Sequence, residues 1–128
     1  MVASPYPADR AKAAKIIGCS ENTSLSHLII TLLRDYDPQV KLSAIYAAAL
    51  LKDKSSRTII IDLLQDNQYN AACYDALKLY GYDVLDQLEQ LFYKSGLPIS
   101  IQLQIISLYA YIGIMAENDL SVKSDLEI

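Results

Sequence analysis

The side chains that most often carry chemistry are few in this sequence and lie far apart along it. His27 is the only histidine, so any Ser-His-Asp or Cys-His arrangement must use it. It lies beside Ser24 and Ser26 in the first turn of a predicted helix, where an exposed or capping histidine is ordinary. The sequence has no glycine-rich phosphate loop, no G-x-S-x-G elbow and no H-E-x-x-H helix. These observations favour a protein that is not an enzyme.

The two cysteines, Cys19 and Cys73, are too few for a disulfide framework and favour a reduced, cytoplasmic (intracellular) setting. Neither has a Cys or His neighbour at the spacing of metal ligands, so we expect no zinc and no other cofactor. Cys73 lies among alanines in a predicted helix and is expected to pack as a small hydrophobic residue. Cys19 follows Gly18 at a helix end, where we expect its thiol to be accessible.

Two pairs of carboxylates have the spacing of neighbours on one helix face: Asp62 with Asp66, and Asp86 with Glu89. Paired acids can do acid–base catalysis, but a solvated helix face is the more typical reason for such spacing. We therefore expect all four side chains to be exposed.

Composition limits the classes of function further. The chain has 128 residues, 52% of them hydrophobic when its ten tyrosines are counted, which is enough for one domain with a core. The formal net charge is −4, so a broad basic surface for nucleic acid is absent and we expect no nucleic-acid partner.

One stretch resembles a membrane span in length. Residues 95–116 carry no charge, but Pro98, Gln102 and Gln104 interrupt their apolar character. We expect a half-buried globular helix there and no membrane insertion. The first residues lack the apolar region of a signal peptide.

The elements that position these residues are predicted to be helices throughout, because apolar residues recur at helical spacing and nowhere alternate strictly. Asp37 is expected to cap a helix whose first position is Pro38. Ser55 or Ser56 is expected to cap the following helix, and Gly81 to occupy a left-handed position after a helix end. The predicted helices lie between Pro7 and Gly18, at 24–35, 38–52, 57–66, 69–80 and 84–94, and from Pro98 to near Gly113.

These helices form a repeat. The segment Leu32 to Asp35 matches the segment Leu63 to Asp66, about thirty residues later. Helix pairs of this period, each too small to bury its own apolar face, are typical of an α-solenoid. The helices between the matching segments are predicted to turn small residues inward: Ala44, Ala47, Ala48, Ala72, Ala76 and Ala110.

The segment from Asp37 to Leu51 closely resembles the second helix of a HEAT repeat. Residues 7–18 look like another copy, whereas 69–81 lack the Asp-Pro start and 98–113 have Gln102 near the basic position. The resemblance covers residues 6–113. It implies an all-α, right-handed α-solenoid (alpha-alpha superhelix) of about seven helices and three to three and a half HEAT-like repeats. The matching positions of the clearest copy are Asp37, Pro38, Val40, Lys41, Ala44, Ala47, Ala48 and Leu51.

We predict a single domain over residues 1–128, with 114–128 as a tail or an incomplete helix. The predicted repeats begin with a second helix and continue past the last one, so one end lacks a polar cap. Two interpretations stay open: the chain is a piece of a longer solenoid, which we favour, or another chain covers the open end. End-to-end self-association is one form of the second. The apolar residues with which the tail would form an incomplete helix or cover the open end are Leu120, Val122, Leu126 and Ile128.

The tyrosines are the feature of the composition that points to binding, since ten Tyr stand against one Phe and no Trp. Their hydroxyls favour contact with water or a partner; the simpler alternative is that each ring lies half-buried at a helix boundary. We predict a non-enzymatic interaction or scaffold module that binds a protein or peptide on the concave face of the solenoid. The predicted polar stripe on that face is Ser43, Tyr46, Asp75, Lys78, Gln104, Ser107 and Tyr111.

The alternative function is an enzyme with a site on the same face, of the pigment-lyase or DNA-glycosylase type. A glycosylase would require a basic concave surface, which the net charge of −4 does not favour. Iron hydroxylases with HEAT-like repeats require His-Glu pairs for their metal, and this sequence has none.

Overall fold

The computed structural model describes the backbone of residues 2–127 and the side chains of residues 2–115. No strand occurs between residues 2 and 127, which confirms the predicted all-α class. The α-helices and the two 3-10 turns, η1 and η2, are α1 (Pro7–Cys19), η1 (Thr23–Leu25), α2 (Ser26–Leu33), α3 (Pro38–Leu51), α4 (Arg57–Leu63), α5 (Asn70–Tyr80), η2 (Gly81–Val84), α6 (Leu85–Phe92) and α7 (Ile99–Glu127).

Helix α3 begins as the sequence predicts. Oδ1 of Asp37 accepts hydrogen bonds from the backbone N–H groups of Gln39, at 2.9 Å, and Val40, at 3.3 Å. Pro38 occupies the first helical position, where its missing N–H leaves no hydrogen bond unmade. The predicted left-handed backbone at Gly81 is also confirmed, since its φ is +70°.

The predicted N-cap residue of α4 is confirmed in its position, but its side chain does not cap the helix. Ser56 lies at the N-cap position, but its hydroxyl donates to the carboxylate of Asp53 and makes no hydrogen bond with the helix amides. Both residues are buried, so the hydrogen bond from Ser56 takes the place of the bonds with water that the Asp53 carboxylate loses on burial. The start of the helix predicted over 24–35 also differs, because residues 23–25 form η1 and α2 begins at Ser26.

The predicted end of the last helix near Gly113 is wrong, since α7 continues through this glycine to Glu127. A glycine inside a helix costs only about 1 kcal/mol relative to alanine, so neighbouring helix-forming residues can carry the helix past it. The repeat pattern predicted that Ala110 faces inward, but Ala110 is exposed. The apolar side chains of the predicted tail lie outside the described residues.

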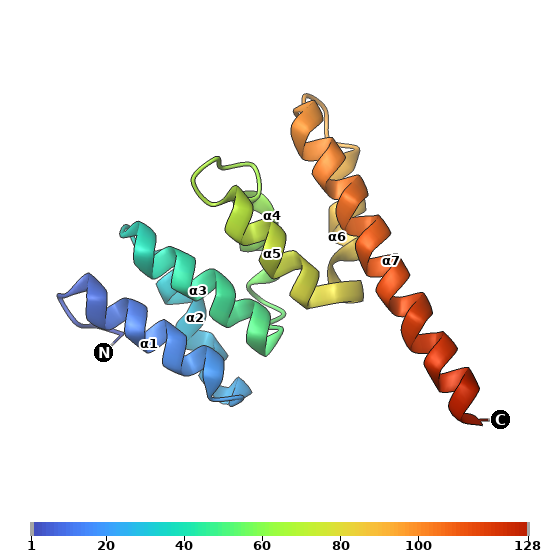
Figure 1. Cartoon of the computed structure of the whole chain (residues 1–128). Helices are drawn as coiled ribbons and strands as arrows, with labels where there is room; N and C mark the ends of the chain where they lie inside the picture. Colours follow the sequence, from blue (N-terminus) through green and yellow to red (C-terminus); the bar gives the residue numbers. More distant parts are fainter. Residues whose placement is uncertain (1, 128) are drawn as a thin grey trace. The chain divides into compact units, whose positions relative to one another are not determined.

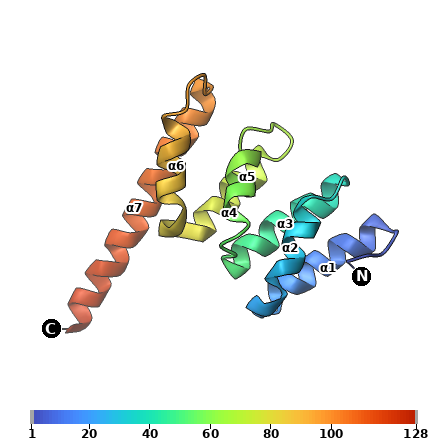
Figure 2. The same cartoon turned by 180° about the vertical axis from the view of Figure 1, so that it is seen from behind.

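Contacts divide the chain into two compact units, unit 1 (Met1–Tyr80) and unit 2 (Gly81–Ile128), and each is described by itself. In unit 1, α1, α3 and α5 lie side by side (Figure 1). Helix α2 packs on α1 and α3, and α4 packs on α5, as the opposite view shows (Figure 2). Unit 1 is therefore a double layer of helices, with α3 at its centre.

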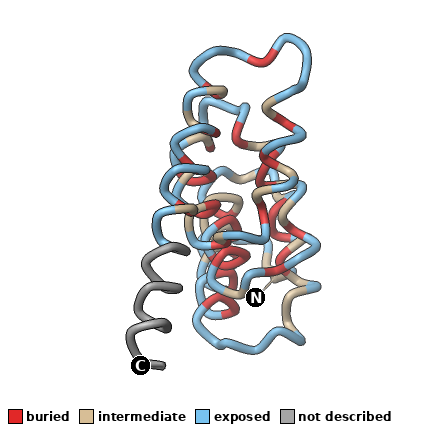
Figure 3. The backbone as a smooth tube through the Cα atoms, turned by 90° about the vertical axis from the view of Figure 1, so that its right-hand side faces the viewer, coloured by how far each residue is buried: buried red, intermediate tan, exposed pale blue. Residues whose placement is uncertain are grey.

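The core of unit 1 lies between these two layers. Its largest fully buried side chains include Ile29, Leu32 and Leu33 of α2 and Ile45 of α3. Buried positions recur along each helix between exposed ones, as amphipathic helices require (Figure 3). The predicted burial of the small residues on α3 and α5 is confirmed for Ala44, Ala47, Ala48, Ala72 and Ala76.

Two polar contacts join distant parts of unit 1. The guanidinium of Arg10 on α1 donates to both carboxylate oxygens of Asp35, at 2.7 and 3.2 Å, which fixes α1 to the turn before α3. The hydroxyl of buried Tyr80 donates to the carbonyl oxygen of Asp53 at 2.8 Å. That bond ties the end of α5 to the loop after α3.

Unit 2 consists of η2, α6 and α7. Helix α6, whose Leu88 is fully buried, packs against α7, whose Ile105 and Leu108 are also fully buried. The opposite side of α7 exposes large apolar residues, among them Leu103 and Ile114. Among the helices that the structure describes, none combines the length and the apolar character needed to cross a bilayer.

Candidate functional site

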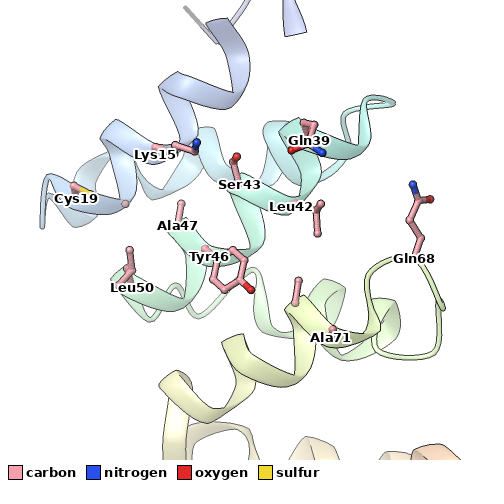
Figure 4. Close-up of a pocket in the computed structure, with 12 residues that line it drawn as sticks. Lys15, Cys19, Gln39, Leu42, Ser43, Tyr46, Ala47, Leu50, Gln68 and Ala71 are labelled. Atoms are coloured by element: carbon pink, nitrogen blue, oxygen red, sulfur yellow. The ribbon is translucent and has the colours of Figure 1, made fainter. Parts of the chain in front are cut away.

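A groove of about 610 Å³ runs along the layer of α1, α3 and α5 in unit 1. Figure 4 shows α3 in its middle, with side chains from α1 on one side and from α5 and the loop before it on the other. The groove is lined by Lys15, Gly18, Cys19, Gln39, Leu42, Ser43, Tyr46, Ala47, Leu50, Gln68, Ala71 and Ala72.

Helix α3 forms the floor of this groove through one of its faces. Ser43 lies three or four residues from Gln39 and Tyr46, Tyr46 lies four residues from Leu42 and from Leu50, and residues at these spacings share a helix face. The other faces of α3 carry fully buried residues of the core. The packing of α3 therefore presents these five side chains to the groove.

The wall formed by α1 depends on the small size of Gly18. A Cβ atom added at Gly18 would lie 2.8 Å from the Cα of Ala47 and 3.0 Å from its Cβ, closer than packed atoms approach. Helices α1 and α3 therefore touch backbone to backbone at this point. This contact sets the distance between Lys15 and Cys19 on one side of the groove and α3 on the other.

Tyr46 is the largest side chain in the groove. Its ring leaves α3 toward Ala71 on α5 (Figure 4), and the residue keeps 41% of its surface exposed. Partial burial, and then the negative charge of nearby Asp75, raise the pKa of its hydroxyl above the ordinary value. The phenol is therefore neutral at physiological pH, and beside its interaction with Asp75 it offers a ring face and a hydroxyl oxygen that can accept a hydrogen bond.

The remaining lining mixes apolar surface with groups that can form hydrogen bonds. Lys15 is the only ionised side chain among the lining residues at neutral pH, and Gln39, Ser43 and Gln68 are neutral and polar. Leu42, Leu50 and the alanines provide the apolar part. This arrangement can bind a peptide segment by shape and hydrogen bonds, with a place for one carboxylate at Lys15.

The seven residues of the predicted polar stripe are divided between the two units, with four on α3 and α5 of unit 1 and three on α7 of unit 2. Ser43 and Tyr46 line the groove, while Asp75 is exposed on α5 close enough to Tyr46 to influence its pKa. Lys78, also on α5, places its Nζ 4.6 Å from the ring centroid of Tyr74. The other three predicted residues belong to α7 of unit 2 and do not line this groove: Gln104, Ser107 and Tyr111.

Several residues of the groove were missed by the sequence reasoning. Gln39, Leu42 and Leu50 carry a usable signal, because they lie at helical spacing from Ser43 and Tyr46. Lys15 and Gln68 carry no such signal, since only the packing of α1 and of the loop before α5 brings them to α3.

Of the groups singled out for chemistry in the sequence, Cys19 lines the groove, whereas the others lie outside it. His27 is exposed, and its Nδ1 lies 2.9 Å from the carbonyl oxygen of Ser24. Cys73 is fully buried as predicted, and burial raises the pKa of its thiol to about 12. Cys19 is exposed as predicted. The four carboxylates expected on solvated faces are indeed exposed: Asp62, Asp66, Asp86 and Glu89.

Within the part of the chain whose side chains are described, no group of three or more His, Cys, Asp or Glu residues is placed to hold a metal ion. The groove therefore stands as the candidate site on its geometry. Comparison of this chain with protein-family models, with curated proteins and with solved structures finds no match in any of the three.

Proposed function

We propose that this protein is a non-catalytic interaction module of the HEAT-like α-solenoid type, which binds a protein or peptide segment in the groove of unit 1. The observation that carries the proposal is the groove itself: about 610 Å³, floored by one face of α3 and lined by Ser43 and Tyr46. A volume of this size lies within the range of ligand-binding clefts.

The architecture supports the HEAT-like part of the proposal through unit 1. Helices α1, α3 and α5 correspond to the second helices of three successive predicted repeats, and they lie side by side, with α2 and α4 behind them. The Asp-Pro start of α3 caps its helix in the way that the HEAT pattern requires.

Binding would proceed by docking onto a preformed surface. Fully buried residues hold α3 in place from behind, so little conformational entropy is lost on the side of this chain when a partner binds. Tyr46 acts as the anchor, because a half-exposed ring with a neutral hydroxyl combines a large contact area with one directional hydrogen bond. Two free thiols, one of them exposed, support an intracellular setting.

The experiment places a photocrosslinking residue, benzoylphenylalanine, in the groove at Ser43 and, as a control, at Asp62 on the exposed face of α4. Crosslinking in the source cells should give discrete adducts from position 43 only. The captured partner is then purified, and its affinity is measured against wild type, Tyr46→Ala and Tyr6→Ala. Tyr6 is the matched control, because it is an exposed tyrosine of unit 1 outside the groove.

We expect Tyr46→Ala to weaken binding about tenfold, which is typical of an anchoring aromatic residue, and Tyr6→Ala to leave the affinity within a factor of two. The melting temperature of Tyr46→Ala should stay within a few degrees of wild type, because Tyr46 keeps 41% of its surface exposed and is not one of the buried core residues. Equal adducts from both positions, or an unchanged affinity of Tyr46→Ala, would refute the proposal.

We also propose that two copies of the chain associate end to end through the exposed side of α7. Leu103 and Ile114 keep 60% and 58% of their surface exposed on a segment without charged residues, in a chain of net charge −4. An uncharged apolar face can meet its own copy without like-charge repulsion. Light scattering should therefore give a dimer for wild type and a monomer for Leu103→Glu; a wild-type monomer at 100 μM would contradict the proposal.

A further inference from the structure

A second pocket, of about 380 Å³, lies entirely within unit 2, between α6 and α7. Its walls are three aromatic rings, two isoleucines and one carboxylate. The size fits one long side chain better than a segment of backbone, because it is near the lower end of the range for ligand-binding clefts. The lining residues are Glu89, Phe92, Tyr93, Ile105, Ile106 and Tyr109.

The rings come from the last residue of α6, from the residue that follows it and from α7. Phe92 and Tyr93 are perpendicular, with ring centroids 5.3 Å apart, and Tyr109 lines the pocket from α7. Tyr93 is largely exposed, so part of its ring surface is open to a ligand. The faces of aromatic rings carry partial negative charge and attract cations.

Glu89 supplies the only ionised group of the lining. The Tyr109 hydroxyl lies 3.2 Å from the carbonyl oxygen of Leu85 and 3.4 Å from Oε2 of Glu89. One hydroxyl has one hydrogen to donate, whereas a carboxylate can accept about four hydrogen bonds. Glu89 therefore retains acceptor capacity toward the pocket.

The charged residues of α6 and η2 near the pocket are negative, like Glu89 itself. Asp83 and Asp86 precede Glu89 at successive spacings of three residues, and all three are exposed. Lys94 is the only basic residue among positions 81–115. A cation approaching α6 is thus attracted, and an anion is repelled.

We propose that this pocket binds the side chain of a lysine or arginine that a partner protein presents. The aliphatic stem of such a side chain packs against the exposed Ile106, and its charged end reaches the rings and the Glu89 carboxylate. Lysine and arginine join an apolar stem to a cationic head, so they match both the apolar part of the pocket and the part formed by the rings and the carboxylate. The site lies in unit 2 and does not depend on the groove of unit 1.

The test uses short capped peptides, N-acetyl-Gly-Lys-Gly-amide and its arginine, norleucine and glutamate counterparts, added to the full chain. Binding is followed by NMR through the methyl groups of Ile105 and Ile106. We expect saturating shifts in the millimolar range for the lysine and arginine peptides, because a single exposed ion pair and a ring contact are each weak. The norleucine and glutamate peptides should shift these methyl groups little.

Variants assign the effect to the carboxylate. Glu89→Gln should weaken the lysine peptide about fivefold, the upper range for one exposed ion pair, and Asp62→Asn on α4 should change nothing. Raising the salt concentration from 50 to 500 mM should weaken binding to wild type more than to Glu89→Gln.

The inference is overturned if the norleucine peptide binds as tightly as the lysine peptide, which would indicate a purely apolar pocket. It is also overturned if Glu89→Gln leaves the affinity for lysine unchanged, or if no peptide shifts the isoleucine methyl groups at 20 mM. The comparison of lysine with norleucine uses the wild-type protein alone, so it decides the matter even if a variant folds poorly.

Discussion

The contact between Gly18 and Ala47 makes a quantitative prediction about how α1 and α3 are held together. In Gly18→Ala the new methyl carbon would lie 2.8 Å from a backbone atom, the Cα of Ala47, which a side-chain rotation cannot relieve. One of the two helices must therefore move. Inserting one carbon into a close-packed contact costs about 1–3 kcal/mol.

A compensating gain reduces this cost. Alanine is favoured over glycine inside a helix by about 1 kcal/mol, and by less at Gly18, which is the second-last residue of α1. The net loss in the free energy of unfolding should therefore be about 1–2 kcal/mol. For a chain of this size that corresponds to a fall of roughly 3–8 °C in melting temperature.

Gly113→Ala is the matched control. Gly113 lies inside α7, and a Cβ atom added there meets nothing within 4 Å. The same chemical change should therefore stabilise the protein, by about 0.5–1 kcal/mol. The two substitutions thus differ in sign, and packing is the only reason for the difference.

Urea unfolding followed by circular dichroism measures both effects on the same scale. A Gly18→Ala variant as stable as wild type would refute the close contact between α1 and α3. A loss of stability in Gly113→Ala comparable to that of Gly18→Ala would refute the packing explanation, because it would show that both helices require glycine for another reason.

Two further predictions follow from the buried groups of unit 1. The Arg10 guanidinium lowers the pKa of the Asp35 carboxyl, so the pair stabilises the fold above the ordinary pKa of about 4 and loses this effect as the pH falls through the lowered value. Asp35→Asn should therefore have a lower free energy of unfolding than wild type at pH 7, and this difference should shrink below a pH of about 4. Urea unfolding at pH 7 and below pH 4 measures the difference. A difference that does not depend on pH would contradict the prediction. The Cys19 thiol should react with a disulfide reagent at pH 8 in the native protein, whereas Cys73, whose pKa burial raises to about 12, should react only after unfolding. Two rapidly reacting native thiols would contradict the burial of Cys73.

Much of the local structure could be predicted from the sequence. The helical class follows from the spacing of apolar residues, and the start of α3 follows from Asp37 and Pro38, whose effects reach only one turn along the chain. The positive φ of Gly81 and the burial of Cys73 are also local consequences, of a helix end and of a helix face rich in alanine. Interactions between residues close in sequence decide all of these features.

The tertiary structure decided what lies beside what. The hydroxyl of Tyr80 at the end of α5 donates to the carbonyl oxygen of Asp53, 27 residues earlier in the chain. The sequence pointed to Ser43 and Tyr46, yet the groove also needs Lys15 and Gln68, which belong to other elements. The close approach of α1 to α3 at Gly18 and the packing of α5 beside α3 create the site. Such contacts join residues far apart in the chain, and no short pattern in the sequence encodes the distance between them.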